Sequence, residues 1–145
     1  MSIHETNPAG AKDLLDGDES WTLVDVRSPQ EFAAGHIPGA YNLPIAFRGP
    51  MGMEFNESFV SAARECFEKD SRLVLICAAG VRSRKAAEFL EAEGYSRLAN
   101  MNGGMSGGFN AAGSAPEAGW MDQGFEVTSE PVEGRTWEAL SARVG

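Results

Sequence analysis

Short apolar runs alternate with amphipathic segments along most of the chain. The apolar runs, typical of buried strands, predict strands at residues 22–26, 40–43, 72–76 and 97–101. Helical spacing and helix-start signals predict helices at residues 8–15, 29–34, 57–68 and 83–93 and, after a glycine-rich turn, near 105–112. Residues 47–55 are punctuated by Gly49 and Pro50 and predict a loop. Alternating strands and helices predict an α/β fold with a central, mostly parallel sheet and helices on both faces.

Three of the predicted helices carry clear local signals. Asn7 before Pro8 is typical of a helix start, and residues 28–31 (Ser-Pro-Gln-Glu) form a capping box with proline in the first helical position. Apolar residues recur at helical spacing between residues 57 and 68, so we expect one face of that helix to be buried. Cys66 lies on this face, and we expect it to serve packing rather than catalysis.

Residues 114–145 differ from the rest of the chain. A linker-like segment of small residues comes first, and two tryptophans and a phenylalanine follow it. Residues 136–143 predict a terminal helical turn or two. We therefore divide the chain into a domain at residues 1–113 and a C-terminal extension at residues 114–145 that is partly packed or disordered. The aromatic residues favour partial packing.

Length, composition and charge narrow the class of protein. With 145 residues, the chain is long enough for one domain with a sizeable core. Its formal net charge of −9 argues against nucleic acid or an anionic membrane surface as the main partner. No apolar stretch in the sequence approaches the length of a membrane span, and residues 1–5 lack the basic and apolar regions of a secretory signal.

The two cysteines are too few for a disulfide scaffold. The sequence has no CxxC pattern and no cluster of histidine and cysteine, so we expect no metal site. Two free cysteines fit a reducing compartment in which a reactive thiol persists, and we therefore expect a cytoplasmic protein.

The clearest candidate chemistry follows the apolar run at residues 73–76. Cys77 is followed by three small residues and then by a predicted helix start that carries Arg82 and Arg84. Such a loop directs several backbone N–H groups and the positive end of a helix dipole at one spot. We expect the sulfur of Cys77 to be a thiolate there, with an anion docked beside it. Without this loop, Cys77 would be interpreted as the last buried residue of a strand.

The two arginines strengthen this interpretation. Arginine is unfavourable at the N-terminus of a helix because its charge opposes the dipole. Arg82 and Arg84 therefore indicate that an anion is bound at this position, with Arg82 the stronger candidate. The alternative is that both are solvated helix residues.

Three motifs resemble those of the rhodanese (sulfurtransferase) family. The pattern Cys77-x-x-Gly80-x-Arg82-Ser83 resembles the active-site loop of that family. Residues 23–32 and 35–44 together resemble its first signature, and residues 102–105 resemble its last. The motifs occur in the expected order and span roughly residues 3–113. There is no internal repeat, so the chain resembles a single-domain member with a rhodanese-like fold.

The resemblance implies sulfur transfer through a covalent intermediate. Cys77 would take the outer sulfur from a small anionic donor such as thiosulfate, form a persulfide, and pass the sulfur to a thiol or a sulfur-carrier protein. Arg82 would steer the donor, and no cofactor is implied. The residues expected to bind the substrate or the persulfide are Ala78, Ala79, Gly80, Val81, Arg82 and Ser83.

Residues outside the loop have supporting roles in this interpretation. Asp25 and Arg27 end a predicted strand, and Glu31 lies one short helix away. We expect a fixed ion-pair cluster that holds the wall of the site rather than a direct substrate contact. His36 lies in a Gly-His-Ile-Pro turn and is expected to be a hydrogen-bonded turn residue rather than a general base. Gly108 stands where the family commonly has a tryptophan, which leaves the local packing open.

Two other functions remain possible from the sequence. A cysteine phosphatase or arsenate reductase of related fold would resemble Cys-x5-Arg, whereas this chain has the shorter Cys-x4-Arg spacing between Cys77 and Arg82. A non-catalytic rhodanese-like module for binding or regulation often lacks the cysteine, which this chain keeps.

Overall fold

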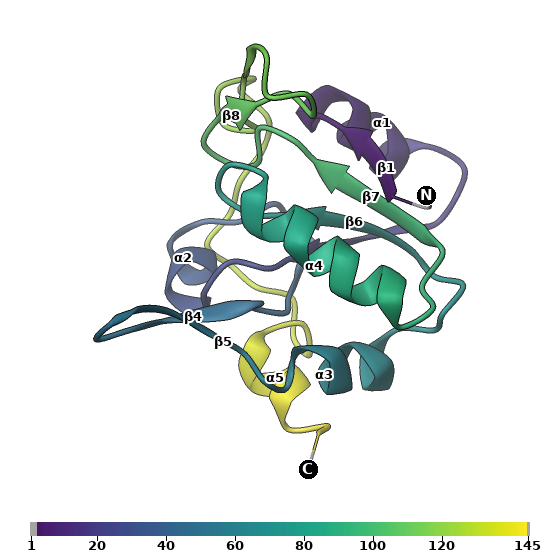
Figure 1. The fold of residues 1–145 in the computed structure, drawn as a ribbon, viewed down its shortest axis with the longest axis vertical. Helices are drawn as coiled ribbons and strands as arrows, with labels where there is room; N and C mark the ends of the chain where they lie inside the picture. The colour runs from purple at the N-terminus through teal and green to yellow at the C-terminus, as the bar shows by residue number, and fades with distance from the viewer. Residues whose placement is uncertain (1–2, 145) are drawn as a thin grey trace.

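A five-stranded parallel sheet forms the centre of the computed structural model, which describes residues 3–144 (Figure 1). The order across the sheet is β1-β7-β6-β2-β3, and each adjacent pair is parallel. The predicted α/β class is therefore confirmed. The strands are β1 (Ile3–Thr6), β2 (Trp21–Asp25), β3 (Tyr41–Asn42), β6 (Arg72–Ile76) and β7 (Arg97–Met101).

Helices cover both faces of this sheet. One face packs against α1 and α2, and the other packs against α3, α4 and α5. Two predicted helix starts are confirmed, because Asn7 Oδ1 accepts a hydrogen bond from Gly10 N at 2.8 Å and the Ser28–Glu31 capping box is present. The helices are α1 (Pro8–Asp16), α2 (Pro29–Ala34), α3 (Phe59–Cys66), α4 (Val81–Ala92) and α5 (Trp137–Ser141).

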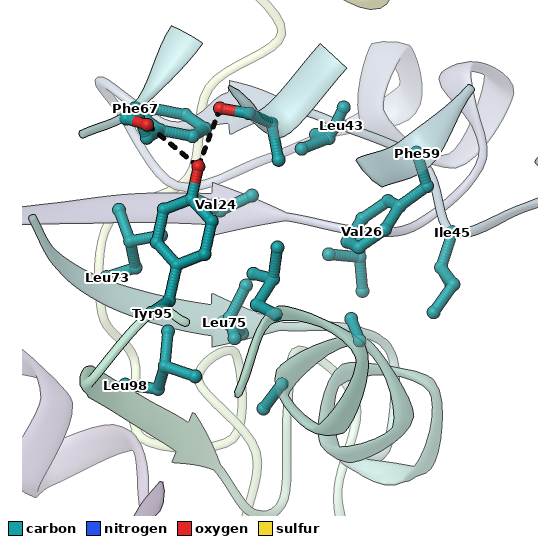
Figure 2. Close-up of a cluster of buried hydrophobic side chains, with 14 of the residues drawn as sticks. Val24, Val26, Leu43, Ile45, Phe59, Phe67, Leu73, Leu75, Tyr95 and Leu98 are labelled. Atoms are coloured by element: carbon teal, nitrogen blue, oxygen red, sulfur yellow. Dashed lines mark hydrogen bonds between the residues drawn. The ribbon is translucent and has the colours of Figure 1, made fainter. Parts of the chain in front are cut away.

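The central strand β6 divides its side chains between two hydrophobic clusters. Leu73 and Leu75 point into the cluster beneath α3, α4 and α5, and Cys77 belongs to the same cluster. Val74 and Ile76 point into the cluster beneath α1 and α2. Figure 2 shows the first cluster, in which the Tyr95 hydroxyl donates hydrogen bonds to main-chain carbonyl oxygens of α3 and of the residue after it. Strand alternation therefore fixes the face on which Cys77 lies.

The loop predicted at residues 47–55 is wrong. The chain forms an antiparallel hairpin of β4 (Ala46–Gly49) and β5 (Gly52–Phe55), with Pro50 and Met51 in the turn. Pro50 was correctly interpreted as punctuation and lies in the turn, whereas Gly49 is the last residue of β4 and pairs with Gly52. The strands escaped prediction because the hairpin projects from the body of the fold (Figure 1) and all of β5 is exposed, so there is no alternation of buried and polar positions.

The short helix predicted near residues 105–112 is also wrong. The N–H groups of Met105 and Ser106 donate to the carbonyl oxygens of Cys77 and Ala78, so they are committed to another segment. The chain then forms β8 (Gly108–Phe109), which pairs with β9 (Pro116–Glu117). Contacts between distant segments therefore replaced the local helical pattern.

The C-terminal residues pack against the rest of the structure. Trp120 and Leu140 are buried in the two clusters, and His36 and Thr128 exchange main-chain hydrogen bonds at 2.8 Å. The predicted terminal helical turn is present as α5, capped by the Thr136 side chain. Within residues 3–144, no helix has both the length and the apolar character needed to cross a membrane.

Candidate active site

Cys77 lies at the carboxyl end of the central strand, where a short loop leads into α4. The Cys77 loop (residues 77–83) curls around its own sulfur. Cys77 Sγ accepts hydrogen bonds from the N–H groups of Gly80 at 3.1 Å and Ser83 at 3.3 Å. Only 1% of the residue is exposed. A sulfur held by main-chain donors at a helix N-terminus is in an environment that favours an anion.

The turn that follows β7 packs against this loop and holds it in place. Gly80 has the positive φ of +107° at the N-cap of α4, a conformation that suits glycine. A Cβ atom on Gly104 would overlap the carbonyl oxygen of Cys77, so only glycine permits this close approach. The N–H groups of Met105 and Ser106 then bind the first two carbonyl oxygens of the loop at 2.9 and 2.8 Å. The Gly103-Gly104-Met105 motif thus fixes the loop in place.

A buried pair of polar side chains lies behind the sulfur. Ser83 Oγ lies 3.5 Å from Cys77 Sγ and donates to Asn100 Oδ1 at 2.6 Å. Both Ser83 and Asn100 are fully buried. Asn100, in β7, was not among the predicted site residues. The only signal in the sequence is a polar residue inside an apolar strand, which must find a partner when it is buried.

Arg82 makes a bidentate ion pair with Glu31. Its Nη1 and Nη2 atoms donate to the two carboxylate oxygens at 2.8 and 2.9 Å. Glu31 is also bound by the main-chain N–H of Ser28 in the capping box of α2. The hydrogen bonds from Arg82 lower the pKa of Glu31 to about 2. The anion that Arg82 meets in the structure is therefore a carboxylate of the chain itself.

Arg84 and Arg27 also have carboxylate partners, and Arg84 contacts its partner through a single nitrogen. Arg84 Nη2 lies 3.1 Å from Glu5 Oε1 and 2.7 Å from Asn102 Oδ1, while its buried Nε–H has no acceptor among residues 3–144. The expected ion pair between Asp25 and Arg27 is present and buried, with Arg27 Nη2 2.8 Å from Asp25 Oδ2. Each of these three arginines thus has a carboxylate partner.

His36 occupies the turn position predicted for it. Its ring stacks on Phe32 with centroids 3.8 Å apart, and Nδ1 lies 2.8 Å from the carbonyl oxygen of Phe32. The ring is almost fully buried, and its main chain pairs with Thr128. These contacts agree with a structural turn histidine.

Gly108 presses directly against the Cys77 loop. A Cβ atom at this position would overlap the carbonyl oxygen of Ala79, so no side chain fits at residue 108 unless the Cys77 loop moves. Phe109 follows and is mainly exposed. A groove of about 330 Å³ runs here, with Ala79, Val81 and Phe109 among its lining residues. A larger cavity of about 480 Å³ lies between α1 and the C-terminal residues, and its lining includes no residue of the Cys77 loop.

The fold and the loop agree with the comparisons to known proteins. The family model described as a rhodanese-like domain matches residues 7–111. The chain therefore belongs to the rhodanese-like domain family.

Individual relatives and a solved structure are similar to much of the chain. The mitochondrial protein HIGH ARSENIC CONTENT 1 of Arabidopsis thaliana is 35% identical over 110 residues, which cover 76% of this chain and 58% of that protein. The putative sulfurtransferase YtwF of Bacillus subtilis is 30% identical over 72% of this chain and 89% of its own length. The crystal structure of Rv0390 from M. tuberculosis has a TM-score of 0.71 at 23% identity and covers 88% of this chain and 98% of that one. This last likeness shows the fold alone.

Proposed function

We propose that this protein is a sulfurtransferase that carries sulfur as a persulfide on Cys77. The observation that carries the proposal is the pair of N–H groups, from Gly80 and Ser83, that converge on Cys77 Sγ. Several relatives at 29–36% identity have the name thiosulfate sulfurtransferase or putative sulfurtransferase, which supports the same activity. The proposed acceptor is a thiol or a sulfur-carrier protein, and one relative is named as a putative sulfur carrier protein.

The first half-reaction is a displacement at sulfur. The Cys77 thiolate attacks the outer sulfur of thiosulfate, a new S–S bond forms, and the old S–S bond breaks with its electron pair leaving on sulfite. The persulfide that remains, Cys77–S–S⁻, has one negative charge on its outer sulfur. The N–H groups of Val81 and Arg82 lie in the first turn of α4, where helices leave donors without an intrahelical acceptor. In this proposal these donors stabilise that charge.

In the second half-reaction, Cys77 Sγ is the leaving group. A nucleophilic acceptor attacks the outer sulfur, forms an S–S bond in the case of a thiol, and leaves the electron pair of the broken bond on Cys77 Sγ as thiolate. No redox partner is needed, because sulfur moves at constant oxidation level. This is a two-step covalent mechanism, and it predicts ping-pong kinetics.

The proposal is tested by intact mass measurement with excess thiosulfate. The protein is expected to gain the mass of one sulfur atom and to lose it on addition of cyanide, with release of thiocyanate. A protein that gains no sulfur at any donor concentration, or that keeps the sulfur in cyanide, contradicts the proposal and favours a non-catalytic module.

A second candidate is oxyanion chemistry at the same thiol, as in a phosphatase or arsenate reductase. It is favoured by one observation, the reference to arsenic in the name of the Arabidopsis relative. The six-residue span from Cys77 to Arg82 and the engagement of Arg82 by Glu31 argue against it. Assays of aryl phosphate hydrolysis and of arsenate reduction with a thiol reductant are expected to show neither activity. Robust turnover in either assay would replace the sulfurtransferase proposal.

A further inference from the structure

Three ion pairs neutralise the charged residues around Cys77. Arg82 is bound by both oxygens of Glu31, Arg84 by Glu5, and Arg27 by Asp25. Arg82 is the arginine that matters most, because it lies close enough to Cys77 for their charges to interact, and its pKa is raised, chiefly by the bond to Glu31. A doubly charged donor must compete with Glu31 for that guanidinium. It must also approach a chain with a net charge of −9.

The Glu31 carboxylate is held in position by contacts other than its ion pair with Arg82. Its Oε1 also accepts hydrogen bonds from Ser28 N and Ser28 Oγ, both at 3.1 Å, which tie it to the start of α2. Arg82 and Glu31 are each about three-quarters shielded from solvent, at 26% and 24% side-chain exposure. A fixed, partly buried, bidentate pair is much harder to displace than an exposed one.

We propose that the preferred donor of this site is an organic persulfide, and that Glu31 selects it over thiosulfate by holding Arg82. This inference rests on the proposed sulfur transfer at Cys77. A persulfide R–S–SH has no dianionic group and needs no free guanidinium. Its substituent can contact the apolar wall of the neighbouring groove, where Val81 is 77% exposed. Thiosulfate gains nothing from such a surface.

The transfer from a persulfide balances without a co-reactant. The Cys77 thiolate attacks the terminal sulfur of R–S–SH and forms the Cys77 S–S bond. The S–S bond of the donor breaks, and its electron pair leaves on R–S⁻. The proton stays on the transferred sulfur or passes to water.

The test compares two donors, thiosulfate and the persulfide of 2-mercaptoethanol, by their kcat/KM values for loading the protein. The parent is expected to use the persulfide at least about tenfold more efficiently. Glu31→Gln keeps an acceptor oxygen for Ser28 but removes the charge, so it is expected to raise the thiosulfate-to-persulfide ratio by about tenfold or more. Added salt should reduce this gain.

Two controls separate the release of Arg82 from other effects. Glu93→Gln makes the same change of net charge and frees Arg64 from a similar but exposed ion pair at the other end of α4, so the ratio should not change. Adding Arg82→Gln to Glu31→Gln should return the ratio toward that of the parent. Thermal melting verifies that each variant is folded.

The outcomes distinguish this inference from the proposed function. If the parent loads from thiosulfate as efficiently as from the persulfide, or if folded Glu31→Gln keeps the parental ratio, the selectivity role of Glu31 is wrong and sulfur transfer stands. If neither donor loads the parent, the proposed function fails and the inference fails with it.

Discussion

The two cysteines of this chain show how differently a fold can treat the same side chain. Cys77 is almost completely buried, yet two main-chain N–H groups and a serine hydroxyl surround its sulfur. Cys66 ends α3 and is more exposed, but burial raises the pKa of its thiol, an effect only partly offset by Arg143. Accessibility alone would therefore favour Cys66 as the reactive thiol, whereas the arrangement of hydrogen-bond donors favours Cys77.

The difference lies in which part of the protein provides the stabilising charge. At Cys77 the donors are main-chain dipoles, fixed by the start of α4 and by the Gly104 turn beneath the loop. At Cys66 the charge is that of a long side chain near the end of the chain, which loses rotamer freedom when it is held in one place. Donors that are already oriented need no rearrangement as negative charge develops on the sulfur.

The largest expected effect comes from replacing each of the two cysteines in turn. Cys77→Ser is expected to abolish sulfur loading, because a hydroxyl is not ionised at neutral pH and cannot form a persulfide. Cys66→Ala should load sulfur at a rate close to that of the parent. Cyanide-dependent release of thiocyanate measures both variants. Persistent turnover in Cys77→Ser would mean that the catalytic sulfur has been assigned to the wrong cysteine.

The next largest effect is expected from a substitution at Gly108 that displaces the Cys77 loop. Gly108→Ala places a methyl group against the carbonyl oxygen of Ala79 and forces the loop to move. A shift of a few tenths of an ångström in the donors around Sγ is expected to lower kcat by roughly tenfold to a hundredfold. Gly35→Ala is the matched control, because a Cβ there meets nothing within 4 Å. Equal kcat values for the two folded variants would show that the loop geometry is not critical.

A smaller effect is expected at the edge of the site. Arg82→Ala leaves the negative charge of Glu31 without its partner, so thiosulfate is repelled and its kcat/KM should fall by about tenfold. The change should be mainly in KM and should shrink in high salt. Arg64→Ala removes an exposed ion pair elsewhere and serves as the control. A fall in kcat alone, independent of salt, would contradict this electrostatic account.

The smallest effect concerns stability in acid. The pKa of Glu31 is lowered from 4.5 to about 2, chiefly by Arg82, so its ion pair stabilises the fold above about pH 5 and is lost as the pH falls through about 2. The Tm of the parent should therefore exceed that of Glu31→Gln near neutral pH, and the gap should close toward pH 2. Melting curves across this range measure it. A Tm difference that widens as the pH falls would contradict this stabilising role of the ion pair.

Local patterns predicted the parts of the site that local contacts determine. The apolar strand, the small residues after Cys77 and the capping box at Ser28 are each recognisable within a few neighbouring residues, and each is present as predicted. The same applies to the Asp25–Arg27 ion pair, whose partners are two residues apart.

Long-range pairings were not predictable in this way. Glu31 and Arg82 lie 51 positions apart, and Ser83 and Asn100 lie 17 apart. Nothing in the sequence near Arg82 indicates that a carboxylate from α2 already occupies it. The same limit explains the predicted helix near residues 105–112, whose main-chain donors were instead taken by the Cys77 loop.

The most direct test of the central claim locates the transferred sulfur. The parent protein is loaded with donor, its free thiols are blocked, and its peptides are analysed by tandem mass spectrometry. We expect the extra sulfur on Cys77, and at Cys66 only a blocked thiol without extra sulfur. Extra sulfur on Cys66, or an equal division between the two cysteines, would contradict the claim that converging main-chain donors, rather than accessibility, select the reactive thiol.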